Sequence, residues 1–274
     1  MSVIKEKIIR LSPKSLLDVY SYFKWIYRAN SHESVYFYTF HKCASSLFST
    51  YVLRNIVGLR HIDFANAIYR GRKIGQIEFK DKGYIYGPIR LSSDTKIYNM
   101  LVKPTSDINF IKDKVAIFLL RDPRDILVSS YYSFGFSHGI SEVEEIKNEQ
   151  NEQRTKIQRR TLDEFALQRS HEILRNFEKI DRLIQAYDRS TVLKYEDMIE
   201  NWDSFARDLT KYIEIKPAVL KQVYSKSRPR EQEDKTAQKR SGKAGGFKDK
   251  LSRETIANLN VTFKPILERF NYDT

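Results

Sequence analysis

The apolar and polar positions of the chain predict strands that alternate with helices. Residues 36–40 and 114–120 are apolar or aromatic without alternation, which is typical of short strands buried on both faces of a parallel sheet. A third short strand is predicted over 191–197, where the run ends in polar residues. Strands that alternate with helices predict an α/β fold. Helical spacing of apolar residues follows the strands, over 47–56, 126–130, 173–187, 201–212 and 256–270.

Three other segments lack this regularity. Residues 1–34 mix charged and apolar residues at helical spacing, which predicts an N-terminal helical segment. Residues 58–93 contain half of the ten glycines and predict an irregular region with a turn at 84–88, of the kind that often lines a pocket. Residues 139–160 are dense in Glu, Gln, Asn, Lys and Arg, which predicts a flexible loop or lid.

Composition predicts one domain over residues 1–274. A content of 41% hydrophobic residues suffices for one sizeable core. The chain has one cysteine, so it has no internal disulfide, and it lacks the roughly 18 uninterrupted apolar residues of a membrane span. The N-terminus lacks the apolar stretch of a signal peptide. We therefore expect a soluble, cytoplasmic protein with no stable membrane insertion.

The net charge of +13 fits either a nucleic-acid surface or a pocket for a small polyanion. The sequence has no zinc-ligand spacing, no RNA-recognition signature and no long Lys/Arg block. Charge alone favours neither interpretation, and the motifs have to decide.

The first strand leads into His41-Lys42-Cys43-Ala44-Ser45-Ser46-Leu47. A tight loop between a strand and a helix directs backbone N–H groups and the positive end of the helix dipole at one point, where an anion binds. Lys42 adds a charge, and Ser45 and Ser46 add hydroxyl donors. This stretch therefore predicts a phosphate or sulfate cradle, although it lacks the G-x-x-x-x-G-K-[ST] spacing of a Walker A loop.

The strand over 114–120 runs directly into Arg121. Asp122 fits a helix N-cap and Pro123 the first helical position, so Arg121 lies at the carboxyl end of a strand, where open α/β sheets bind ligands. A purely structural ion pair between Arg121 and Asp125 at the surface is the alternative. Further on, the glycine-rich and basic residues 240–248 predict a loop that either wraps an anion or is disordered when it is empty.

Four stretches in order resemble the sulfotransferase family that uses 3′-phosphoadenosine 5′-phosphosulfate (PAPS). The cradle over 41–47 resembles its 5′-phosphosulfate loop. Arg121 and Ser129, eight positions apart, resemble its 3′-phosphate motif. Tyr195-Glu196-Asp197 and the loop over 240–248 are similar to its later motifs. The resemblance covers about residues 35–250. It implies a three-layer α/β fold with a mostly parallel sheet, helices on both faces and a P-loop-like nucleotide-binding core.

The resemblance also implies transfer of a sulfuryl group from PAPS to a hydroxyl or amine of a small-molecule or glycan acceptor, without a metal and without nucleic acid as partner. Lys42 is implied to be catalytic. The general base is open, with Glu78, His61 and Asp63 as candidates by position. The residues implied to bind the co-substrate are Lys42, Cys43, Ala44, Ser45, Ser46, Leu47, Arg121, Ser129, Tyr195, Arg240, Ser241, Gly242 and Phe247.

The chain departs from the family pattern at several positions. Ala44 stands where the loop usually has glycine, so the loop must differ if that position needs a positive φ. Phe247 stands in place of a tryptophan. The stretch from Tyr86 to Arg90 contains no histidine, where many members carry their catalytic one. A nucleotide-dependent kinase and a non-enzymatic polyanion binder remain the alternatives. The oligomeric state is open.

Overall fold

The computed structural model describes residues 32–69, 79–90, 107–141, 143–229 and 242–273. The predicted N-terminal helical segment lies almost entirely outside them. The core is a five-stranded sheet with the strand order β2-β3-β1-β4-β5, in which all neighbouring strands are parallel. The α/β prediction is therefore confirmed. The strands are β1 (Val35–Thr39), β2 (Arg60–Ile62), β3 (Tyr84–Arg90), β4 (Val115–Leu120) and β5 (Arg189–Lys194).

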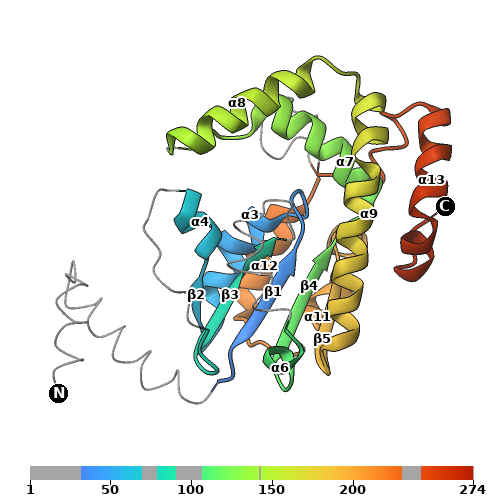
Figure 1. Ribbon diagram of the computed structural model, residues 1–274. Helices are drawn as coiled ribbons and strands as arrows, with labels where there is room; N and C mark the ends of the chain where they lie inside the picture. The colour runs from blue at the N-terminus through green and yellow to red at the C-terminus, as the bar shows by residue number, and fades with distance from the viewer. Residues whose placement is uncertain (1–31, 70–78, 91–106, 142, 230–241, 274) are drawn as a thin grey trace.

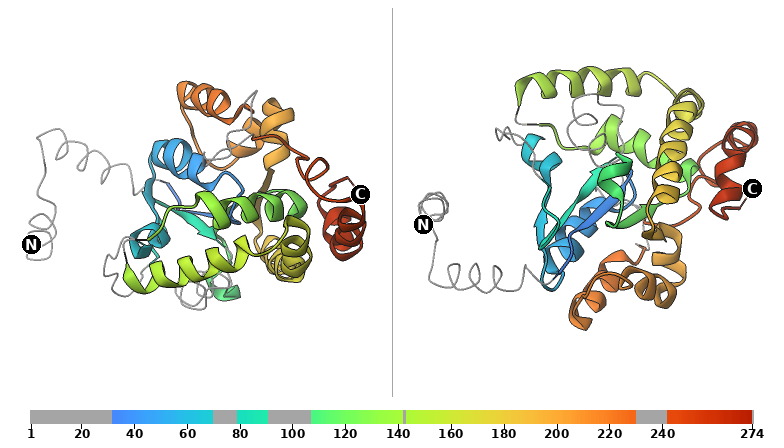
Figure 2. Two further views of the ribbon diagram at one scale, coloured as in Figure 1. Left: turned by 90° about the horizontal axis from the view of Figure 1, so that it is seen from above. Right: turned by 60° about the horizontal axis from the view of Figure 1, so that its bottom comes forward.

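Helices cover both faces of the sheet, which gives the three layers that the family resemblance implies (Figures 1 and 2). One layer contains α7 (Pro123–Tyr132), α9 (Leu162–Ala186) and α13 (Arg253–Arg269), which pack against one another. The opposite layer contains α3 (Ser45–Leu47), η1 (Phe48–Val52), η2 (Leu53–Asn55), α11 (Trp202–Leu209) and α12 (Pro217–Ser227). Shorter or peripheral helical segments are α4 (Phe64–Tyr69), α6 (Ile108–Ile111), η5 (Ser133–Ser137), α8 (Glu144–Gln158) and α10 (Tyr195–Glu200).

The strand register brings four carboxyl-terminal ends to one edge of the sheet. Thr39 of β1 lies beside Arg90 of β3 and Leu119 of β4, and Leu120 lies beside Lys194 of β5. The strands that follow β1 in the sequence, β2 and β3, lie on one side of it, whereas β4 and β5 lie on the other side. The gap between β1 and β4 is therefore the topological switch point, where ligands of open α/β sheets bind.

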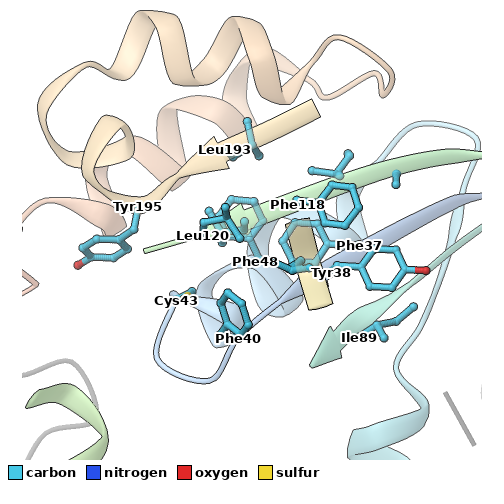
Figure 3. Close-up of a cluster of buried hydrophobic side chains, with 14 of the residues drawn as sticks. Phe37, Tyr38, Phe40, Cys43, Phe48, Ile89, Phe118, Leu120, Leu193 and Tyr195 are labelled. Atoms are coloured by element: carbon cyan, nitrogen blue, oxygen red, sulfur yellow. The ribbon is translucent and has the colours of Figure 1, made fainter. Parts of the chain in front are cut away.

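Aromatic side chains fill the space beneath this edge. Phe37 stacks on Phe48 with ring centroids 5.1 Å apart, and Tyr38 stacks on Phe118 at the same distance. Figure 3 shows this cluster extending toward Cys43, whose side chain is fully buried. Every residue of β1 and β4 is buried, as the unalternating apolar runs predict. The core thus supports the loops that follow these two strands.

The prediction of an irregular region over 58–93 is wrong in part. Among its described residues are β2, α4 and β3, and the turn predicted at 84–88 is the greater part of β3. Gly87 and Pro88, which usually interrupt strands, are accommodated because the pairing of β1 with β3 shifts register between Tyr36 and Tyr38. Aromatic residues in this strand pack into the core, with Tyr86 stacked on Tyr36 at 5.3 Å.

The prediction of a flexible loop over 139–160 is also wrong, because Glu144–Gln158 forms the helix α8. Its composition is poor in apolar residues but rich in Glu, Gln, Lys and Arg, which are strong helix formers. An ion pair one turn apart, Lys156 with Glu152 at 2.5 Å, supports the helix. Figure 1 shows α8 beyond the carboxyl-terminal end of the sheet.

Candidate active site

The loop after β1 forms a compact turn around which the site is built. Ala44 adopts the left-handed conformation with φ 58° and ψ 22°, and Lys42 also has a positive φ of 71°. The family's glycine position therefore does require a left-handed residue, and alanine adopts it here at a steric cost. The predicted helix that follows is a succession of α, π and 3₁₀ turns over Ser45–Asn55.

The side chains of this loop point toward two neighbouring elements. Lys42 Nζ donates a hydrogen bond to Ser133 Oγ at 2.8 Å, which joins the loop to η5. Arg90, at the end of β3, donates from Nη2 to Ser45 Oγ at 3.3 Å. Two cationic side chains, Lys42 and Arg90, thus accompany the cradle and can form charge-assisted hydrogen bonds to an anion.

Arg121, at the end of β4, connects three segments around the cradle. Its guanidinium donates to the Lys42 carbonyl at 3.1 Å and to the Lys243 carbonyl at 3.2 Å, and it contacts Asp125 Oδ2 at 3.3 Å. The guanidinium carbon also lies 4.2 Å from the centroid of the Tyr195 ring. The predicted pair with Asp125 therefore exists, but it lies inside the molecule and not at the surface.

The charges around Arg121 keep it protonated. Burial opposes its charge, but Asp125, Tyr195 and Glu196 outweigh this effect and raise its pKa above the ordinary value. Its Nε is buried and has no hydrogen-bond partner among the described residues. A buried donor without a partner costs free energy, so this atom fits an anionic ligand in the adjacent space.

Asp125 holds the late basic loop against α7. Its Oδ2 accepts a hydrogen bond from the Gly245 N–H at 2.9 Å and its Oδ1 one from the Phe247 N–H at 3.0 Å. Burial raises the pKa of Asp125, while Arg121 opposes the shift. On the other side of the loop, Tyr195 donates its hydroxyl to the Gly242 carbonyl at 2.7 Å. Both ends of the described loop are therefore anchored.

A cavity of about 360 Å³ lies between these elements. It joins the predicted 5′-phosphosulfate loop to the predicted 3′-phosphate motif and to the late loop. One carboxylate lines it, against five cationic side chains, so its charge suits an anionic ligand. The lining residues are Lys42, Ala44, Ser45, Ser46, Leu47, Thr50, Tyr51, Arg121, Asp125, Val128, Ser129, Tyr195, Met198, Lys226, Ser227, Gly242, Lys243, Gly246 and Lys250.

Two predicted binding residues lie behind the cavity wall. Cys43 is buried under the loop, and burial raises its thiol pKa to about 12. The Phe247 ring is buried with the Arg124 guanidinium 4.1 Å from its centroid, so its side chain anchors the loop. Arg240 and Ser241 lie outside the described residues.

His61 and Asp63, two of the three candidates for the general base, make their hydrogen bonds outside the cradle. His61 Nε2 makes a hydrogen bond with the Gly87 carbonyl at 2.7 Å, and the charges that act on its pKa are those of Asp63 and Arg54. Asp63 accepts hydrogen bonds from the Asn66 N–H at 2.9 Å and from Ser49 at 3.4 Å, so it stabilises the start of α4. Glu78 lies outside the described residues.

Several lining residues were not predicted. Thr50 and Tyr51 follow the cradle by one helical turn, and Lys226 and Ser227 end α12. The helical period after Leu47 could have indicated the first two, since residues three and four apart share a helix face. The last two carry no local signal beyond the general basicity of residues 225–250, because only the tertiary fold brings α12 to the site.

Comparison with known proteins agrees with this geometry. The model of the sulfotransferase domain family matches residues 105–271, which is more than half of the chain. The chain belongs to the sulfotransferase domain family. The family predicted from the four motifs, a sulfotransferase of the kind that uses PAPS, is thereby confirmed. The match includes the Arg121 and Tyr195 motifs and the late loop, whereas the cradle lies before it.

Two solved structures are similar to this sulfotransferase. Retinol dehydratase in complex with androsterone and the inactive cofactor PAP has a TM-score of 0.52 at 14% identity, over 85% of this chain and 80% of that one. It supports the assigned fold. A mouse sulfotransferase, SULT7A1, complexed with PAP has a TM-score of 0.49 at 13% identity, over 89% of this chain and 88% of that one. No curated protein sequence matches the chain.

Two further observations concern the part of the chain that the structure describes. None of its helices is long and apolar enough to cross a membrane. No group of three or more His, Cys, Asp or Glu side chains gathers there in a way that could hold a metal ion.

Proposed function

We propose that this sulfotransferase binds PAPS in the cavity between β1 and β4 and transfers its sulfuryl group to a hydroxyl or amine of a small-molecule or glycan acceptor. The observation that carries the proposal is the cavity itself, which joins the Lys42 loop to Arg121 and Ser129. PAPS supplies an activated sulfuryl group on its 5′-phosphate and an additional 3′-phosphate. Two anionic ends match the two groups of donors in the cavity.

Each donor group has a separate role in this proposal. Ser45, Ser46 and the N–H groups of the cradle bind the 5′-phosphate. Arg121 and Ser129 bind the 3′-phosphate, for which the unsatisfied Nε of Arg121 is a suitable donor. Leu47 and Tyr195 border the base, and Gly242 holds the late loop through its bond to Tyr195. Arg240 and Ser241 are proposed as donors from the same loop.

Lys42 acts on the leaving group. Its ammonium, which belongs to the cradle, neutralises the charge that develops on the 5′-phosphate as the sulfur–oxygen bond breaks. The hydrogen bond from Lys42 to Ser133 holds the ammonium toward η5. Catalysis of this kind depends mainly on position and charge, as in phosphoryl transfer.

The chain forms one catalytic domain in this proposal. The residues that line the donor cavity run from Lys42, just after β1, to Lys250, so the cavity draws on most of the described chain. We also propose a cytoplasmic location, which the single buried cysteine supports, because reduced cysteines are usual there.

A thermal-shift titration tests the proposal against its alternatives. 3′-Phosphoadenosine 5′-phosphate (PAP), the product nucleotide, is compared with ATP–Mg²⁺ and with heparin. A ligand that binds only the folded state raises the melting temperature with the logarithm of its concentration. We expect a rise with PAP that is reduced in Lys42→Ala. A rise with ATP–Mg²⁺ but not PAP would favour a kinase, and a rise with heparin alone a polyanion binder.

A further inference from the structure

A second group of side chains lies beyond the Lys42 end of the donor cavity. We call Lys42, Arg90, Ser133, His41 and His138 the transfer end. Lys42 is bonded to Ser133, and Arg90 to the cradle at Ser45. Besides burial, Lys42 and Arg90 both lower the pKa values of the two histidines.

The cations of this group cannot accept the proton that an acceptor hydroxyl must lose. Arg90 stays protonated in proteins, and Lys42 is needed as a cation beside the leaving phosphate. Ser133 already accepts a hydrogen bond from Lys42 at 2.8 Å. The two imidazole rings are the remaining bases of the transfer end.

Both histidines contact the ring of Phe134. The ring centroid of Phe134 is 5.8 Å from that of His41 and 5.3 Å from that of His138, with edge-on contacts in both cases. Neither imidazole makes a hydrogen bond to another group in the described part of the chain, and both rings are only partly buried.

Two hydrogen bonds fix the backbone of His138. Its backbone N–H donates to the Ser133 carbonyl at 2.7 Å, so it is fixed to the same turn that receives Lys42. Its carbonyl accepts a hydrogen bond from Arg154 of α8, which also donates from Nε to the Phe134 carbonyl at 3.4 Å. A fixed backbone next to the turn that binds Lys42 limits the positions that the imidazole can take, and catalysis depends on such positioning of the reacting groups.

The charges that face His138 keep its ring neutral. Burial together with Lys42, Arg154 and Arg90 lowers its pKa to about 4. Burial lowers the pKa of His41 as well, to about 3, together with the cations Arg90, Lys42 and Arg169. Burial and these cations thus favour the unprotonated form of both rings. His41 belongs to the cradle, whereas His138 directly follows η5, whose Ser133 accepts the hydrogen bond of Lys42.

We propose that His138 is the general base that accepts the proton of the acceptor hydroxyl. The inference rests on the proposed function and adds a residue to it. As the acceptor oxygen forms its bond to sulfur, its proton passes to a ring nitrogen of His138. The bond between sulfur and the bridging oxygen breaks, and its electron pair stays on the 5′-phosphate beside Lys42. Atoms and charge balance without a further reactant.

Single-turnover decay of PAPS, with water as the acceptor, tests this role without knowledge of the natural acceptor. PAP formation is measured with enzyme in excess for the wild type, His138→Gln, His41→Gln and His171→Gln, the last on the exposed face of α9. A general base contributes about 100-fold or more, so we expect a loss of that size in His138→Gln and none in His171→Gln. We also expect added imidazole to restore part of the rate in His138→Ala.

The binding of PAP separates this inference from the proposed function. Calorimetry should give the same PAP affinity for wild type and His138→Gln, because the ring lies outside the donor cavity. Absent PAP binding in the wild type would overturn the proposed function itself. The role of His138 would be overturned if PAP binds normally and PAPS decays at the same rate in wild type and His138→Gln. This holds whether that rate exceeds the rate without enzyme or equals it. A loss confined to His41→Gln would overturn that role as well.

Discussion

The guanidinium of Arg121 donates a hydrogen bond to the backbone carbonyl of Lys42 at 3.1 Å. This bond joins the loop after β1 to the loop after β4 across the switch point of the sheet. The same guanidinium donates to the Lys243 carbonyl and so brings in the late loop. One side chain thus positions all three walls of the donor cavity, and its buried Nε has no hydrogen-bond partner among the described residues.

The attachment of the late loop depends on Asp125. In Asp125→Asn one oxygen of the carboxylate becomes an NH₂ group, so the N–H of Gly245 or Phe247 loses its acceptor. We expect a loss of about 1–3 kcal/mol of stability and faster hydrogen exchange at both amides. Asp249→Asn, at an exposed position of the same segment, is the matched control. Unchanged exchange at Gly245 and Phe247 in Asp125→Asn would contradict this role.

Glu196 makes stability depend on pH. Burial raises the pKa of this carboxyl to about 7, while the unfolded chain has an ordinary value near 4.3. Between these values the folded protein binds the proton and the unfolded chain does not. The stabilisation is therefore complete below about pH 4.3 and is lost as the pH rises through 7.

Urea denaturation at pH 5.5 and 8.5 tests this effect. We expect the free energy of unfolding to decrease from pH 5.5 to pH 8.5, and to decrease more in the wild type than in Glu196→Gln. The glutamine keeps an oxygen that can accept the hydrogen bond from the Asp122 N–H. Glu200→Gln, at an exposed position of the same helix, should behave as the wild type. Parallel pH dependence in all three proteins would show that Glu196 is charged in the fold.

The left-handed conformation of Ala44 provides a stabilising substitution. A residue with a Cβ atom is destabilised by about 1–2 kcal/mol in this conformation. Glycine avoids this steric cost, but it loses more backbone entropy on folding, which offsets part of the gain. We expect Ala44→Gly to raise stability by about 0.5–1 kcal/mol with PAP binding retained. Ala257→Gly, on the exposed side of α13, should instead lose about 1 kcal/mol. A loss of stability in both variants would show that the left-handed conformation of Ala44 carries no steric cost that glycine relieves.

The strands next to the switch point could be predicted because β1 and β4 are apolar on both faces. The start of α7 could also be predicted from Asp122 and Pro123. In the structure Asp122 is the N-cap and accepts a hydrogen bond from the Arg124 N–H at 2.9 Å, and Pro123 is the first helical residue. The strand β3 was missed because Gly87 and Pro88 resemble a turn. The helix α8 was missed because its stability comes from helix propensity and ion pairs, with little apolar surface.

The site was predictable where it follows strand ends. Lys42 and Arg121 stand directly after apolar runs, so their position at one edge follows from parallel pairing. Lys226 reaches the cavity from α12, and His138 reaches Lys42 through the turn at Ser133. Neither lies in a local motif, because both positions depend on how distant helices pack on the sheet.

Calorimetric titration with PAP and with adenosine 5′-phosphate tests whether Arg121 binds the 3′-phosphate, because the two ligands differ only in that group. Charge-assisted hydrogen bonds contribute about 1.5–3 kcal/mol, so we expect the wild type to bind PAP about 10- to 150-fold more tightly. In Arg121→Gln this preference should largely disappear. An unchanged preference in Arg121→Gln, or no preference in the wild type, would contradict the assignment of the 3′-phosphate to Arg121.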